Sequence, residues 1–148
     1  MVFVVFSGDH LAGNNTHSKD PGLSGIGIEQ VKKLAQNIKG MIPPKTEVSF
    51  ITSTAQRAIE TSNLISQEVK TSVIKKDARL WSKSPQDVNL NWIKTLISEN
   101  KTEVLIIVTH VHYVSRLPLA YGKADKGKIS PGEALLIQGN SIQEIILR

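Results

Sequence analysis

Four histidines and one arginine are the residues of this 148-residue chain best placed to do chemistry. His10 and His17 follow the first apolar segment, whereas His110 and His112 follow a later one. Histidine exchanges a proton near neutral pH and is the commonest metal ligand. No carboxylate stands beside either pair at a spacing typical of metal ligands, and the strand pattern ends at His110. We therefore predict no metal site.

Arg57 is the one arginine that the pattern places near a potential ligand site. It lies one turn inside a predicted helix that follows a predicted strand. The backbone N–H groups of Ser53, Thr54 and Ala55 would point out of the start of that helix, where the helix dipole favours an anion. Arg57 adds a planar, permanently charged donor. The segment therefore predicts an anion site, although Arg57 could also be a solvated surface residue and the hydroxyls could simply cap the helix.

His110 ends the most apolar segment of the sequence. Residues 104–108 are all apolar and mostly β-branched, which predicts a strand buried on both faces of a parallel sheet. Helix-like spacing begins after His110. Because open α/β sheets bind ligands at the carboxyl ends of their strands, His110 is a candidate site residue. The alternative is that it only caps the strand or the next helix.

The remaining pattern alternates strands with helices. Apolar runs predict strands over residues 2–6, 48–51 and 71–74, and helical spacing predicts helices over 25–39, 52–69 and 84–97. A final hairpin is expected over 134–147, with Gly139 in its turn. We therefore predict a single domain over residues 1–148, a three-layer α/β/α sandwich with a mostly parallel sheet and a C-terminal antiparallel hairpin.

Composition narrows the class of protein further. The formal charge is +5, but the lysines are scattered and aromatic residues make up only 5%, so we expect no nucleic-acid partner. The apolar opening is too short for a signal peptide, and no run is long enough to span a membrane. With no cysteine in the sequence, we predict a cytoplasmic protein without membrane partners.

Three segments together resemble the histidine phosphatase (phosphoglycerate mutase-like) superfamily. Residues 53–61 are similar to its Ser-Pro-x-x-Arg-Ala-x-x-Thr helix motif, and residues 23–30 to its Leu-Thr-x-x-Gly-x-x-Gln segment. Residues 104–117 look like the strand and helix that carry its second histidine. The short chain, with Leu80 followed by residues 84–88, is most similar to the small bacterial phosphohistidine phosphatases.

The resemblance implies phosphoryl transfer to a histidine, followed by hydrolysis, with no cofactor. The nucleophile belongs to an Arg-His-Gly triplet, and the family's second arginine and second histidine correspond to Arg57 and His110. Ser7, Gly8 and Asp9 stand in place of the triplet. Gly8 has no side chain that could accept a phosphoryl group. A hydroxyl at Ser7 can bond a phosphate but cannot replace the charge of an arginine.

Two readings follow from this departure. The first is a catalytically impaired member, a pseudoenzyme, that binds a phosphorylated small molecule or phosphoprotein through Arg57, Ser7, Gly8 and His110. The second is an active phosphatase in which His10, two residues beyond the usual nucleophile, acts with His110 and Arg57. A purely structural module is a third alternative. Three residues are candidates for the acid that protonates the leaving group: Asp9, Asp77 and Asp87. The sequence does not indicate the oligomeric state.

Overall fold

The computed structural model describes residues 1–11, 20–71, 73–139 and 141–145, so His17 lies outside the described residues. Within them, six strands form one sheet in the order β3-β2-β4-β1-β5-β6. β1, β2, β3 and β4 run parallel to one another, β5 pairs antiparallel with β1, and β6 pairs antiparallel with β5. The strands are β1 (Val2–Phe6), β2 (Val48–Thr52), β3 (Ile74–Lys76), β4 (Val104–Thr109), β5 (Ala134–Gln138) and β6 (Ser141–Ile145).

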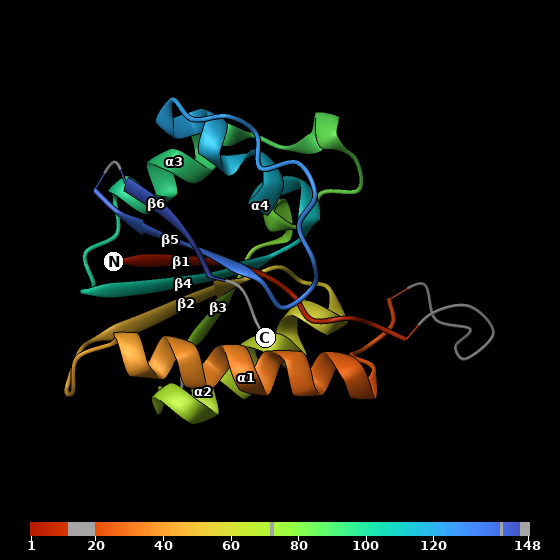
Figure 1. The fold of residues 1–148 in the computed structure, drawn as a ribbon, viewed down its shortest axis with the longest axis vertical. Helices are drawn as coiled ribbons and strands as arrows, with labels where there is room; N and C mark the ends of the chain where they lie inside the picture. The colour runs from red at the N-terminus through yellow and green to blue at the C-terminus, as the bar shows by residue number, and fades with distance from the viewer. Residues whose placement is uncertain (12–19, 72, 140, 146–148) are drawn as a thin grey trace.

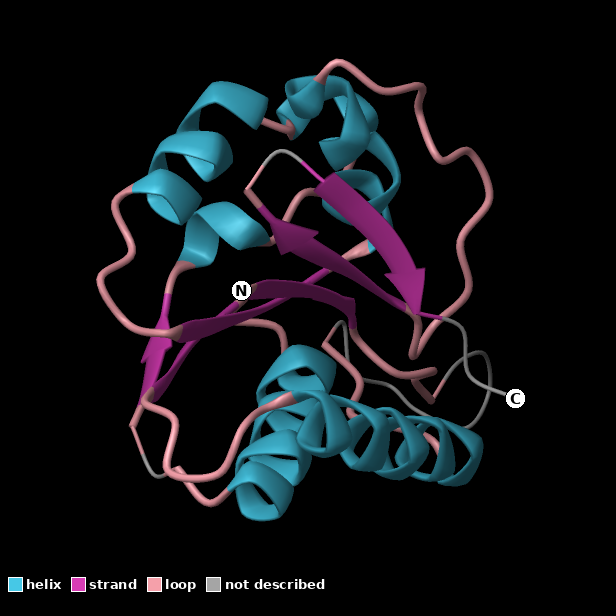
Figure 2. Ribbon diagram, turned by 60° about the vertical axis from the view of Figure 1, so that its left-hand side comes forward, coloured by secondary structure: helices cyan, strands magenta, loops and turns pink. Residues whose placement is uncertain are grey.

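Helices cover both faces of this sheet. α1 (Gly25–Met41) and α2 (Gln56–Val69) lie against one face, and α3 (Leu90–Ser98) and α4 (Val111–Arg116) against the other (Figure 1). Figure 2, viewed from a direction 60° away, shows the strands between the same two groups of helices. Two hydrophobic cores fill the two spaces, and every residue of β4 is buried. The predicted fold class is therefore confirmed, with a mixed sheet and a C-terminal hairpin.

The strand register brings three chain segments to one edge of the sheet. Phe6 of β1 is paired with Thr109 of β4, and Thr52 of β2 with Val108 of the same strand. The backbone N–H of Ser7 then donates to the Thr109 carbonyl at 3.0 Å, and that of Ser53 to the Val108 carbonyl at 2.9 Å. Residues 7–10, 53–57 and 110–112 therefore leave the sheet side by side.

Several element boundaries differ from the prediction. α2, expected from residue 52, begins at Gln56 after its N-cap residue Ala55. α1 continues through Gly40 to Met41, because its end is set at Ile42, whose N–H bonds the Lys39 carbonyl, and by the two prolines that follow. β3 begins at Ile74, because pairing with Phe50 of β2 determines its register. This strand therefore shares only one residue with the predicted range.

The helix expected from residue 84 also begins later. Pro85–Asp87 forms a short 3-10 helix, η3, after a second one, η2 (Ala78–Leu80). α3 begins at Leu90 because the Asn89 side chain accepts a hydrogen bond from the backbone N–H of Trp92 at 2.9 Å. A further 3-10 helix, η4 (Leu117–Tyr121), follows α4. Among the described residues, no helix combines the length and apolarity needed to cross a membrane.

Candidate functional site

A cavity of about 440 Å³ lies at the carboxyl ends of β1, β2 and β4. Gly8, Asp9 and His10 line it from the segment after β1, and Arg57 lines it from α2. The rest of the lining comes from Trp81–Lys83, from residues 110–112 at the start of α4, and from Phe6 and Pro131. The structure thus brings Arg57, His10 and His110 together around one cavity.

His110 is held at the bottom of this site. It is only 3% exposed and precedes α4 as its N-cap residue. Its Nε2 atom lies 2.7 Å from the Ser53 hydroxyl, whereas its Nδ1 atom has no partner among the described residues. Burial, and then the positive charges of Arg57, His10 and His112, lower the pKa of His110 from 6.5 to about 3. His110 is therefore a neutral imidazole at neutral pH.

Arg57 supplies the permanent positive charge of the cavity. It is half-buried in the first turn of α2. Burial lowers the pKa of its guanidinium, and the negative charge of Asp20 acts in the opposite direction. Because an arginine stays protonated at any physiological pH, a cation faces the neutral ring of His110.

Two of the three backbone donors expected at the start of α2, those of Ser53 and Ala55, are used within the protein. The Ser53 N–H bonds the Val108 carbonyl, and the Ala55 N–H bonds the Ser53 hydroxyl at 3.1 Å. The Gln56 N–H bonds the Asp20 carboxylate at 2.8 Å. The Ser53 and Ala55 amides were predicted to bind the anion from their position in the sequence, which does not reveal their partners in the fold. The groups that remain available to attract an anion are the side chains of Arg57 and the histidines.

Position 8, which the resemblance in the sequence predicted to correspond to the nucleophile, is closely packed against α1. A Cβ atom on Gly8 would lie 2.8 Å from the Gly27 carbonyl oxygen and 2.8 Å from Cγ2 of Val31. The Gly8 N–H donates to the Thr61 hydroxyl at 3.2 Å, which fixes the backbone of residue 8 against α2. The chain as folded therefore has no room for a side chain at this position.

Ser7 and Asp9 flank this glycine. Ser7 is fully buried, does not line the cavity, and its hydroxyl has no partner among the described residues. Asp9 lines the cavity, but its Oδ2 accepts a hydrogen bond from the Ser24 hydroxyl at 3.0 Å. Its N–H donates to the Gln30 side chain at 3.0 Å. The carboxylate is thus partly satisfied by α1.

His10 reaches the cavity from the same segment. Its Nδ1 atom lies 2.9 Å from the Leu11 carbonyl oxygen. A carbonyl oxygen only accepts, so Nδ1 carries a proton, and the lone pair of this ring, when it has one, is on Nε2. His10 also contributes to the low pKa of His110, which places the two rings within electrostatic range.

The other carboxylates considered as leaving-group acids lie elsewhere. Asp77 is held by Arg79, whose guanidinium donates to it at 2.7 and 3.0 Å and lowers the pKa of this carboxyl. Asp87 accepts from the backbone N–H of Lys83 at 3.3 Å. Neither residue lines the cavity. Within the described residues, no group of three or more His, Asp or Glu side chains is placed to hold a metal ion.

Several lining residues had no signal in the sequence. Trp81, with its ring centre 6.1 Å from that of His110, and Lys83, with its ammonium 5.6 Å from the Trp81 ring, belong to an irregular segment. Asp20, in a loop, accepts a hydrogen bond from the Gln56 N–H at the start of α2. Such residues are positioned by tertiary contacts, so neither periodicity nor a local motif indicates them.

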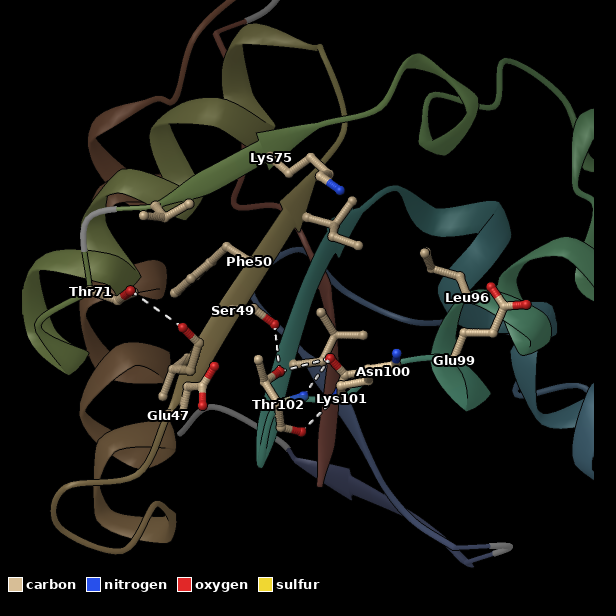
Figure 3. A pocket seen from close by; sticks show the side chains of 14 residues that line it. Glu47, Ser49, Phe50, Thr71, Lys75, Leu96, Glu99, Asn100, Lys101 and Thr102 are labelled. Carbon is tan, nitrogen blue, oxygen red and sulfur yellow. Dashed lines mark hydrogen bonds between the residues drawn. The ribbon is translucent and has the colours of Figure 1, made fainter.

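A larger groove of about 580 Å³ lies on the sheet beside β2, β3 and α3 (Figure 3). Three of its polar side chains bond one another. The Ser49 and Thr102 hydroxyls are 2.7 Å apart, and Thr102 also donates to Asn100 at 2.7 Å, as the dashed lines in Figure 3 indicate. Lysines and glutamates both line this groove. It therefore lacks the concentration of positive charge found around Arg57.

Known proteins are similar to this chain in sequence and fold. Residues 10–80 match the histidine phosphatase superfamily (branch 1), and no match was found among curated proteins. The fold is similar to that of the protein histidine phosphatase SixA complexed with tungstate, with a TM-score of 0.72 and 16% identity. That alignment covers 98% of this chain and 94% of SixA.

Two further solved structures are similar over most of their length. Mycobacterial glucosyl-3-phosphoglycerate phosphatase gives a TM-score of 0.66 at 15% identity, covering 90% of this chain and 87% of that one. A phosphoserine phosphatase mutant from Entamoeba histolytica, in complex with phosphoserine, gives 0.65 at 11% identity, covering 97% and 93%. The chain has the histidine phosphatase fold, and the resemblance found in its sequence is confirmed.

Proposed function

We propose that this chain binds a phosphate-bearing ligand, a small molecule or a phosphoprotein, in the cavity around Arg57 and His110 and is impaired as a catalyst. One observation carries the proposal. Arg57, His10 and His112 line the same cavity as the buried ring of His110, whose pKa is lowered by burial first and then by the charges of these three residues. An anion bound among them would relieve that repulsion, because opposite charges at short range stabilise each other.

The impairment follows from the segment after β1. Residue 8 has no side chain and no space for one, and residue 7 is an uncharged serine outside the cavity. Removing one donor from a transition-state clamp typically costs several kcal/mol, or orders of magnitude in rate. We also propose a cytoplasmic location, which the lack of cysteine supports.

Calorimetric titration with inorganic phosphate tests this function, alongside hydrolysis assays on p-nitrophenyl phosphate and on phosphohistidine. We expect phosphate to bind the wild-type chain, His110→Gln to weaken that binding, and turnover to stay near background. His110 is the informative position because its ring is buried at the cavity floor. Turnover that His110→Gln abolishes would reject the proposal of impairment, and the absence of phosphate binding would reject the site itself.

A second function, hydrolysis through His10, is favoured by the geometry of that ring. Because Nδ1 donates to the Leu11 carbonyl, Nε2 of His10 offers its lone pair to a phosphoryl group in the same cavity. This function predicts an acid-labile phosphohistidine that is trapped by rapid quenching and is absent from His10→Gln. His112→Gln is the matched control, since it also lines the cavity but follows β4. A phosphoenzyme that persists in His10→Gln would exclude His10 as the acceptor.

A further inference from the structure

The hydroxyl of Ser53 lies directly against the ring of His110. Ser53 is the first residue after β2 and is fully buried. Its Oγ atom is 2.7 Å from the Nε2 atom of His110, and it accepts a hydrogen bond from the Ala55 N–H at 3.1 Å. Both contacts are buried. The serine therefore joins the N-cap residue of α2 to the histidine that follows β4.

Two arrangements of protons are compatible with the contact between Ser53 and a neutral His110 ring. In the first, the hydroxyl donates to Nε2, so the ring proton is on Nδ1. In the second, the Nε2–H group donates to the hydroxyl, so Nδ1 carries the lone pair. The neutral ring is the relevant form at neutral pH, because the pKa of His110 is lowered to about 3. The two arrangements present opposite hydrogen-bonding groups at Nδ1.

The hydrogen bonds of Ser53 favour the first arrangement. Its hydroxyl has one proton to donate, and among the described residues no hydrogen bond gives that proton an acceptor other than Nε2. In the second arrangement the hydroxyl accepts from both Nε2 and Ala55, so its own proton and the Nδ1 lone pair both lack a partner. In the first arrangement only the Nδ1 proton lacks one. Buried polar groups without a partner are rare, because folding removes their bonds to water.

The charge of Arg57 acts in the opposite direction. A cation attracts a lone pair, so it favours an unprotonated Nδ1. Within the part of the chain that the structure describes, Arg57 makes no hydrogen bond to His110, whereas the Ser53 hydroxyl is in direct contact with the ring. Electrostatic interactions weaken with distance, so we expect the contact with Ser53 to determine the position of the proton.

We infer that Ser53 is a positioning residue that keeps the His110 proton on Nδ1, so that the neutral ring donates a hydrogen bond to the bound oxyanion. The inference rests on the proposed phosphate-binding function, for which it names a further determinant. His110 lines the cavity and its buried Nδ1 has no partner in the described residues, as expected of a donor whose acceptor is a ligand. Because Arg57 and His110 then both donate, they would hold a fully deprotonated oxyanion such as sulfate as well as phosphate.

Nitrogen NMR of the unliganded full chain tests the position of the proton directly, because the protonated and unprotonated nitrogens of a neutral imidazole resonate far apart. The signals of His110 are those that disappear in His110→Gln. We expect the proton on Nδ1 in the wild-type chain and on Nε2 in Ser53→Ala. Ser62→Ala is the matched control, since it removes an equally buried hydroxyl that donates to the Ala58 carbonyl at 2.9 Å. It should leave the proton of His110 on Nδ1.

Calorimetry with sulfate and with inorganic phosphate measures the consequence for the ligand, at a mildly alkaline pH where both are mainly dianions. We expect similar affinities in the wild-type chain and in Ser62→Ala. In Ser53→Ala, an unprotonated Nδ1 can accept the proton of hydrogen phosphate, but it can only repel sulfate. Sulfate binding should therefore weaken about tenfold more than phosphate binding, as one hydrogen bond to a charged group provides.

The outcomes separate this inference from the function on which it rests. If neither ion binds, the proposed function fails, and the NMR spectrum alone shows where the His110 proton lies. A wild-type ring protonated on Nε2 would overturn the inference even if phosphate binds, and this spectrum does not depend on the folding of Ser53→Ala. A proton that stays on Nδ1 in Ser53→Ala, or equal losses of sulfate and phosphate binding in that variant, would also overturn it.

Discussion

Replacing Arg57 with glutamine should weaken the binding of inorganic phosphate by about 10- to 100-fold. Hydrogen bonds to charged groups contribute about 1.5–3 kcal/mol, and about 1.4 kcal/mol corresponds to a tenfold change in affinity. Arg57 is half-buried, so salt screens its charge less than that of an exposed lysine. Glutamine keeps a polar side chain of moderate length while the charge is lost.

The same substitution has a second, independent readout. The charge of Arg57 lowers the pKa of His110, so Arg57→Gln should raise that pKa. Because burial is the larger cause, the pKa of His110 should still remain below 6.5. Titration of the histidine ring protons by NMR measures this change in the absence of any ligand.

Phosphate binding is measured by calorimetry at low and moderate ionic strength, with Lys101→Gln as the control. This comparison separates a direct contact between Arg57 and phosphate from the effect of the net charge of the protein. Lys101 lies on the groove beside β2, labelled in Figure 3, and its loss changes the net charge by the same amount. We expect phosphate affinity to be unchanged in Lys101→Gln. Equal losses in the two variants, or no loss in Arg57→Gln, would refute the reasoning that Arg57 contacts the anion.

Three further predictions concern packing, pH and charge. Gly8→Ala should lower the free energy of unfolding in urea by about 1–3 kcal/mol, because its Cβ would lie 2.8 Å from backbone. At Gly40 an added Cβ has no neighbour within 4 Å, so Gly40→Ala should instead raise the free energy of unfolding by about 0.5–1 kcal/mol. Equal changes in the two variants would contradict the argument that position 8 is closely packed. Because the pKa of His110 is lowered from 6.5 to about 3, the unfolded chain takes up a proton that the folded chain does not. The free energy of unfolding should therefore fall as the pH drops from 6.5 to about 3, and it should fall less steeply in His110→Gln. The same pH dependence in both proteins would contradict the assignment of this effect to His110. Asp20→Asn should tighten phosphate binding severalfold by removing the negative charge that acts on Arg57, and weaker binding would show that Asp20 orients the site instead.

The elements that position the site were largely predictable from the sequence. Residues 2–6 and 104–108 are all apolar and nearly all buried, so the pattern alone predicts their strands. Because parallel strands end at one edge of a sheet, the meeting of Arg57 and His110 in one cavity followed from the order of the elements.

The remaining features depend on packing between distant segments. Glycine often ends a helix, so Gly40 was the expected end of α1. The C-cap residue is instead Ile42, whose N–H bonds the Lys39 carbonyl. The clash at position 8 depends on how closely α1 approaches β1, which no local pattern encodes. Asp20 and Trp81 come from irregular segments, where periodicity is absent and only the fold determines position.

The most direct test of a phosphoryl site around Arg57 and His110 is a crystal structure of the chain grown with tungstate, a phosphate analogue with strong anomalous scattering. The account predicts an anomalous peak in the cavity, within hydrogen-bonding distance of the Arg57 guanidinium and beside the His110 ring. A well-diffracting crystal with this cavity empty and tungstate bound only to surface lysines would contradict it.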